Sequence, residues 1–324
     1  MNIGTSFARI RQGLADRFAA LPHSSKAILW AVAAGLIFSA MNMLMRHMTL
    51  QMHPFEAQFL RQFFGLLVML PIVIGAGLAR FKTASVPRQF GRGALHALGT
   101  SLWFFALPHL ALADTTAIGF TGPIFSMIGA AYLLGEKMRW DRWVAALIGF
   151  TGVLIVVGPR LAGTGGWYSL IMLASAPVFS LSFLFTKLLT RQDNPSVIVF
   201  WQGVTVSIIS LPLAVVFWTW PTPTQWLIFV IAGVLGSTGH FCLTHSLKAA
   251  DMSATQSVKF LDLIWATMWG FLVFGDIPAG ATLAGALMQA GLVDELLLYV
   301  AAVLLGEQGR PLLAGIAPQS MAQR

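Results

Sequence analysis

The sequence predicts an all-α membrane protein, arranged as a ten-helix bundle of two inverted five-helix repeats. Three observations support this fold class: the composition, a series of long apolar segments and an internal repeat. Of the 324 residues, 57% are hydrophobic and only 10% are charged, whereas soluble globular proteins carry about a quarter charged residues. Because so few charges cannot cover a water-soluble surface of this size, we expect the chain to lie in lipid.

Long apolar segments follow one another along most of the chain. A helix needs roughly 20 apolar residues to cross the hydrocarbon core, and the segments are too long and too closely spaced for the strands of a membrane barrel. Backbone groups in lipid must be satisfied within the segment, so each is predicted to be a helix. A tenth helix is predicted to start near residue 278, and the first nine span 27–47, 54–77, 91–110, 113–134, 140–158, 167–190, 196–218, 224–246 and 253–274.

The basic residues of the connecting segments fall mostly on one side of the predicted bundle. Residues 1–26 carry four of them and repeat apolar residues at helical spacing, which is typical of an amphipathic helix on the membrane surface. Arg46 and Arg160 are the basic residues predicted on the opposite side. The positive-inside rule then places the N-terminus in the cytoplasm and the chain in the inner membrane. Topology also explains the net charge of +8 without a nucleic-acid partner.

Two stretches of the sequence resemble each other at an offset of 140 residues. Residues 111–136 read ALADTTAIGFTGPIFSMIGAAYLLGE, and residues 251–276 read DMSATQSVKFLDLIWATMWGFLVFGD. Each has a polar start, a long apolar helix and a Gly-acid end. Since the first closes the fourth predicted helix and the second the ninth, an odd number of crossings separates them, and the copies are inverted in the membrane. Inverted repeats around a midplane site are a recurrent transporter architecture.

These two stretches, the first continued through KMRWDRWVAALIGFTGVLIVVGP to residue 159, are similar to the EamA-type domains of the drug/metabolite transporter superfamily. The resemblance covers about residues 28–293, and the two repeats are delimited as 27–158 and 167–293. It implies a five-plus-five helix carrier that works by alternating access. It also implies substrates such as amino acids, vitamins, nucleotide-like metabolites or exported drugs.

The C-terminal region departs from this pattern. Asp294 and Glu295 stand where the tenth helix should cross the membrane, and each acid there would cost a few kcal/mol. Residues 290–313, AGLVDELLLYVAAVLLGEQGRPLL, resemble a piece of the reductase domain of riboflavin-biosynthesis deaminase/reductase proteins, far too short for a cofactor site. A frameshift, a fusion or a misassembled reading frame explains this better than a second function. Alternatively, the acids face the bundle interior of a continuous helix 278–304. Helix 10 is therefore atypical or truncated, with an atypical tail over 294–324.

Ionisable side chains inside a membrane are costly, so each one is a candidate functional residue. In the second predicted helix, Arg61 is either a substrate contact or a structural arginine that reaches the outer interface; its spacing from Glu56 does not favour a pair. Lys259 and Asp262, at i and i+3 in the ninth helix, share one face. They form either a structural ion pair or a site for a charged substrate or a proton, and Trp265 extends that face as an aromatic wall.

Other candidates are weaker. His240 and His245 have i, i+5 spacing, which does not match the i, i+4 zinc pair, so His240 is either a proton relay or a packing histidine. Thr121 and Pro123 interrupt the fourth helix, as broken helices at transporter sites do, and a plain kink explains them equally well. The remaining residues serve helix packing as often as binding: Asn42 and Trp103, which we include in the candidate cavity, and His96, Ser101 and Gln202.

A secondary carrier of a small organic metabolite is the function that these features favour. No GxxxxGK[ST] loop occurs, so direct ATP coupling is not expected, and a proton or substrate gradient is the default driving force. We expect no cofactor, and Cys242, as the lone cysteine, gives no disulfide or cysteine-based metal site. The partners are the substrate and membrane lipid, and a homodimer is compatible with the sequence. The alternatives are an intramembrane enzyme, or a channel or non-transporting scaffold.

Overall fold

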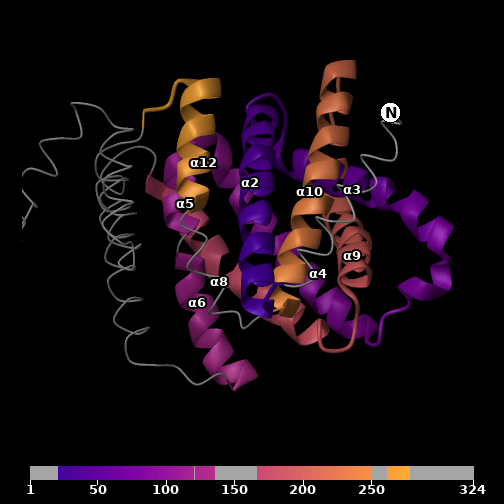
Figure 1. Cartoon of the computed structure of the whole chain (residues 1–324). Coiled ribbons are helices and arrows are strands. Elements are labelled where there is room, and N and C mark those ends of the chain that lie inside the picture. Colours follow the sequence, from indigo (N-terminus) through magenta and orange to yellow (C-terminus); the bar gives the residue numbers. More distant parts are fainter. Residues whose placement is uncertain (1–20, 120, 136–165, 250–260, 278–324) are drawn as a thin grey trace, which may run out of the picture.

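The computed structural model describes residues 21–119, 121–135, 166–249 and 261–277, and within these ranges every regular element is helical (Figure 1). Six helical segments of this part of the chain are long and apolar enough to cross a membrane. They span Ser25–Thr49, Pro54–Ala76, Leu112–Leu134, Gly166–Leu189, Pro195–Val216 and Pro223–Ala249. The chain is therefore a multi-pass, all-helical membrane protein, as the composition predicts.

Helix boundaries agree with the predicted segments within a few residues. The elements are α2 (His23–Thr49), α3 (Pro54–Ala76), η1 (Leu78–Phe81), α4 (Val86–Ala106), η2 (Leu107–His109), α5 (Leu112–Gly119), α6 (Thr121–Gly129), η3 (Ala130–Leu134), α8 (Gly166–Leu189), α9 (Pro195–Val216), α10 (Pro223–Ala249), α12 (Leu261–Trp269) and η5 (Gly270–Phe274). The predicted amphipathic N-tail, the helix over 140–158, and the tenth helix with its tail lie outside the described residues.

Local sequence signals explain where α3 and α9 begin. Each starts with a proline in its first turn, where the missing N–H is not needed by the helix. His53 precedes α3, and its Nδ1 accepts the backbone N–H of Phe55 at 3.4 Å. The His53 ring stacks on Phe217 at a centroid distance of 3.8 Å. Burial lowers the pKa of His53 because desolvation disfavours the imidazolium.

The two sequence copies end in the same local geometry. After α6, the segment η3 forms a five-residue π-helix that stops at Gly135, and after α12, η5 does the same before Gly275. Both glycines are left-handed, with φ of +70° and +68°, a conformation that glycine adopts without a Cβ penalty. The Gly-acid stops of the sequence thus mark equivalent helix ends.

These equivalent ends lie at opposite ends of α2. Asp276, which follows η5, forms an ion pair with Arg46 near the C-terminus of α2. Ala130 of η3 instead packs with Leu247 of α10, and the serine before Leu247 donates to the carbonyl of Ala27 near the N-terminus of α2 at 2.9 Å. Figure 1 shows the same arrangement, with α6 and α12 ending at opposite ends of the bundle.

Close helix contacts hold the bundle around α3, α4 and α10. The helix α10 packs against α2 and α3, and α4 packs against α8 and α9. A Cβ added at Gly233 of α10 would lie 2.7 Å from the backbone N of Gly65 in α3. Gly65 and Gly233 thus let α3 and α10 approach closely.

One basic residue lies elsewhere than the charge pattern predicts. The charge pattern counts Arg92, at the start of the predicted third helix, with the basic residues of the connection before it, near the membrane surface. The structure instead places it inside α4, with 1% of its surface exposed. Its burial is tolerated because its guanidinium donates to acceptors on α8 and α9.

Candidate functional site

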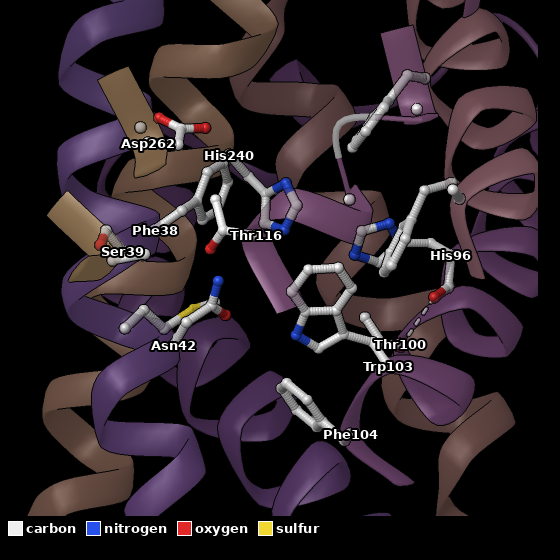
Figure 2. A pocket seen from close by; sticks show the side chains of 18 of the residues that line it. Phe38, Ser39, Asn42, His96, Thr100, Trp103, Phe104, Thr116, His240 and Asp262 are labelled. Atoms are coloured by element: carbon white, nitrogen blue, oxygen red, sulfur yellow. Dashed lines mark hydrogen bonds between the residues drawn. The ribbon is translucent and has the colours of Figure 1, made fainter. Parts of the chain in front are cut away.

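A cavity of about 200 Å³ lies among the helices, and residues from α2, α3, α4, α5, α6, α8, α10 and α12 line it. Much of its wall is aromatic. Trp103 and Phe104 come from α4 and Phe38 from α2 (Figure 2). Phe179 comes from α8. Trp103 meets Phe179 edge to face at a centroid distance of 6.1 Å. Aromatic faces of this kind suit a planar or apolar part of a ligand.

Two histidines from different helices meet in the wall of the cavity. His96 of α4 and His240 of α10 have ring centroids 4.9 Å apart and an interplanar angle of 77°. Only 2% of His96 and 7% of His240 are exposed. The two rings meet edge to face, and Figure 2 shows them with Thr116 and Trp103 nearby. Phe38 also contacts the His240 ring at 4.9 Å, so aromatic packing fixes the position of that ring.

A chain of hydrogen bonds leads from Arg92 to His240. Nη2 of Arg92 donates to Oε1 of Gln202 at 2.7 Å, and Nε of Arg92 donates to Thr186. Nε2 of Gln202 lies 2.9 Å from Nε2 of His240. A guanidinium can only donate, so the oxygen of the Gln202 amide must face Arg92 and its NH₂ must face His240.

Arg61 of α3 is also buried, with 2% exposed, and it lines the cavity. Its Nη2 donates to Oε1 of Gln62 at 2.8 Å, and its Nη1 lies 3.7 Å from the sulfur of Met41. The guanidinium also lies 5.7 Å from the ring centroid of Phe104. The Arg61 side chain is thus in the wall of the cavity. Glu56 does not pair with it and instead accepts two hydrogen bonds from Thr219.

Asp262 reaches the cavity from the first turn of α12. It packs closely on α2, because a Cβ added at Gly35 would lie 2.0 Å from Oδ1 of Asp262. Glycine at this position therefore makes room for the carboxylate. Lys259, the predicted partner of Asp262, lies outside the described residues, so the pair stays a prediction.

The other predicted residues divide between lining and non-lining positions. Asn42, Arg61, Trp103, His240 and Asp262 line the cavity. Thr121 and Trp265 are described but are not among the lining residues, and the side chain of Pro123 lies outside the described part of the chain.

The hydroxyl of Thr121 donates to the carbonyl of Ile118 at 2.9 Å. Its neighbour Gly122 does line the cavity and accepts from Ser180 at 2.8 Å. His245 stacks on Trp30 at 5.1 Å and is not a lining residue.

The sequence leaves His96 open between helix packing and binding and does not place it in the candidate cavity, whereas the structure places it in the cavity wall. A signal for it exists in the repeat: His96 lies in the third helix of the first half and His240 in the third helix of the second half, so the two come from corresponding helices, and at the 140-residue offset they lie about one turn apart. The aromatic and hydroxyl residues Phe38, Ser39, Thr100 and Phe179 were also missed. No group of three or more metal-binding side chains occurs in the portion of the chain that is described.

Comparison with known proteins agrees with this architecture. The chain is 34% identical over 262 residues to the riboflavin transporter of Rhizobium johnstonii, covering 80% of this chain and 86% of that protein. It is 28% identical over 269 residues to the S-adenosylmethionine uptake transporter of Rickettsia bellii, covering 83% and 92%. It is also 25% identical to the pseudopaline exporter CntI of Pseudomonas aeruginosa, covering 81% and 92%.

A solved crystal structure shares the fold, with a TM-score of 0.64 and 19% identity over 82% of this chain and 94% of that one. Residues 277–323 match the RibD C-terminal domain, which confirms the resemblance predicted for the tail. Residues 25–158 and 166–291 each match the EamA-like transporter family. With both halves of the bundle matched, the chain belongs to the EamA-like transporter family.

Proposed function

We propose that this transporter is a secondary carrier that moves a small organic metabolite across the inner membrane by alternating access, with the central cavity as its substrate site. The observation that carries this proposal is that helices of both repeats form the wall of the cavity. Helices α2 to α6 belong to the first matched repeat, and α8, α10 and α12 belong to the second. A ligand held between two repeats is exposed to either side when one repeat moves against the other.

The ten-helix inverted arrangement is part of this proposal. It is supported by the π-helical ends at Gly135 and Gly275, which lie at opposite ends of α2. The repeats are assigned to residues 27–158 and 167–293. The distribution of basic residues supports a cytoplasmic N-terminus.

The substrate is proposed to be a small organic molecule with a planar or apolar part. The named relatives transport S-adenosylmethionine, riboflavin or pseudopaline, so they differ in substrate and in direction. A volume of about 200 Å³ lies below the 300–1,000 Å³ usual for ligand pockets. The cavity is therefore small for a ligand pocket, and a substrate bound in it would touch the aromatic wall. Lys259 and Asp262 are proposed to bind a charged group of the substrate or a proton.

Uptake into proteoliposomes under an imposed pH gradient tests the carrier function. We expect wild-type protein to accumulate at least one of the relatives' substrates above its external concentration, which a channel cannot do. Lys259→Ala and Asp262→Ala should each abolish transport while leaving membrane insertion intact. Arg80→Gln, at an exposed arginine of η1, is the control and should transport normally. Absence of gradient-dependent flux for every candidate metabolite would contradict the proposal.

A further inference from the structure

Buried nitrogen atoms without hydrogen-bond partners occur on several side chains that line the cavity. Among the described residues, Nε of Arg61, Nε1 of Trp103, Nδ1 of His240 and both ring nitrogens of His96 have no hydrogen-bond partner. All four residues line the cavity. Buried polar groups are almost always paired, because leaving one unpaired costs about 1–3 kcal/mol. A neutral imidazole carries one N–H, so a ligand that supplies acceptors would satisfy Arg61, Trp103, His240 and one nitrogen of His96.

The hydrogen-bond chain from Arg92 determines what His240 offers to this ligand. Since the NH₂ of Gln202 faces Nε2 of His240 at 2.9 Å, that ring nitrogen must accept. A neutral imidazole that accepts at Nε2 carries its proton on Nδ1. His240 therefore presents an N–H donor, and no acceptor within the described ranges takes it.

Arg61 and the two histidines converge on one another. Nη1 of Arg61 lies 2.8 Å from the position that a Cβ on Gly236 would occupy. Gly236 and His240 are four residues apart on α10, so they share a face. The guanidinium of Arg61 and the rings of His96 and His240 thus form one cluster, which we call the donor cluster.

The charge of this region points to an anion. In the described part of the chain, Arg61 and Arg92 donate only to neutral acceptors, and a buried cation without an anionic partner is unfavourable. Asp262 is the acid that lines the cavity. It packs on Gly35, whereas Arg61 contacts Met41, and six residues of helix correspond to about 9 Å along the α2 axis. Asp262 and the guanidinium of Arg61 therefore occupy different levels of the cavity.

A carboxylate fits the donor cluster better than a phosphate does. A carboxylate has two oxygens with about four lone pairs and accepts the edge of a guanidinium in a bidentate manner. Of the two buried arginines Arg61 and Arg92, Arg61 is the one that lines the cavity. The single negative charge of a carboxylate balances this one guanidinium, whereas a phosphate group carries about −1.5 to −2 at neutral pH. We propose that the substrate carries a carboxylate and that this group binds between Arg61, His96 and His240.

This inference rests on the proposed carrier function and narrows its substrates. S-adenosylmethionine carries an amino-acid carboxylate, whereas riboflavin has none. The chain is therefore assigned to amino-acid-bearing metabolites rather than to neutral vitamins.

The test uses ligand pairs that differ only in the carboxylate. Purified full-length protein is titrated with S-adenosylmethionine and its decarboxylated form, with methionine and methioninamide, and with riboflavin. We expect the carboxylate member of at least one pair to bind about tenfold or more tightly than its partner, which corresponds to one charge-assisted hydrogen bond or more. Arg61→Gln should weaken this binding about 10- to 100-fold, and His96→Gln should weaken it less. Arg80→Gln removes an exposed charge and should change nothing.

Arg61→Lys is the variant that separates a binding defect from a folding defect, because lysine keeps the positive charge but lacks the planar guanidinium. It should bind the carboxylate members with intermediate affinity and should not bind their partners more tightly. Equal affinity for both members of every pair, no binding by any carboxylate probe, or unchanged affinity in a folded Arg61→Gln would overturn the inference. Gradient-driven transport of riboflavin alongside such a result would leave the carrier function standing, so the two failures are distinguishable.

Discussion

Arg61 and Arg92 are both buried arginines in adjacent helices, yet their surroundings differ. The guanidinium of Arg92 lies between α4, α8 and α9 and donates to Thr186, to the carbonyl of Ile198 and to Gln202. The guanidinium of Arg61 lines the cavity, has one conventional hydrogen bond, to Gln62, and has an Nε without a partner in the described segments. Burial alone therefore does not distinguish a structural arginine from a ligand-binding one. The two kinds of arginine differ instead in whether the N–H groups of the guanidinium have acceptors within the protein. The following predictions test that distinction.

The largest expected difference is between Arg92→Leu and Arg61→Leu. Arg92→Leu removes hydrogen bonds to two neighbouring helices and should lower the free energy of unfolding by about 2–4 kcal/mol. Arg61→Leu should lower it by less than about 1 kcal/mol, because it removes one hydrogen bond. Thermal unfolding in detergent, followed by circular dichroism, measures both. Equal destabilisation by the two changes would show that the two arginines have the same structural role.

The glycines on either side of Arg92 test how tightly its region is packed. A Cβ at position 93 would lie 2.5 Å from Cβ of Thr205 on α9, so Gly93→Ala should destabilise the protein by about 1–3 kcal/mol through overpacking. The matched change Gly91→Ala meets nothing closer than 4.0 Å and should be neutral or slightly stabilising. The same unfolding measurement applies, and equal effects at the two positions would argue against a close α4–α9 contact.

Gln202 connects the packed region to the cavity, and Gln202→Glu probes this connection with almost no change in shape. A carboxylate at position 202 can still accept from Arg92, but it cannot donate to Nε2 of His240. We expect thermal stability to be kept and carboxylate-probe affinity to fall about 3- to 10-fold, because the proton of His240 moves away from Nδ1. Gln202→Asn, which restores a donor on a shorter side chain, should recover part of the affinity. Unchanged affinity in Gln202→Glu would exclude Gln202 as a positioning residue.

The smallest expected effect concerns the Arg46–Asp276 pair at the end of α2, whose side chains are 11% and 22% exposed. Its partial exposure contrasts with the complete burial of both central arginines. Asp276→Asn should lower stability by about 1 kcal/mol or less, and the effect should shrink at high salt. Unfolding temperatures at low and high salt measure it. A salt-independent loss would indicate that the pair is more deeply buried than its exposure suggests.

The sequence predicts the helices well because a spanning helix needs an apolar segment long enough to cross the bilayer. It also predicts that Arg61 and Asp262 are functional candidates, because an ionisable group in lipid needs a reason to be there. It does not show that Arg92 is buried. The preceding segment, Pro87-Arg88-Gln89, resembles a loop. The burial of Arg92 is tolerated only because α8 and α9 supply hydrogen-bond acceptors for its guanidinium. His96 and Phe179 were missed for a related reason, since membership of the cavity depends on which faces of α4 and α8 meet.

The ion pair between Arg46 and Asp276 affects how the protein distributes between the conformations of its carrier cycle. It joins the first helix of one repeat to the end of the fourth helix of the other, at one end of the bundle. If the repeats separate at that end during the carrier cycle, the ion pair must break, and both charges then become hydrated. An interaction of about 1 kcal/mol shifts a two-state equilibrium about fivefold. The pair would therefore favour the conformation closed at that end without locking the protein in it.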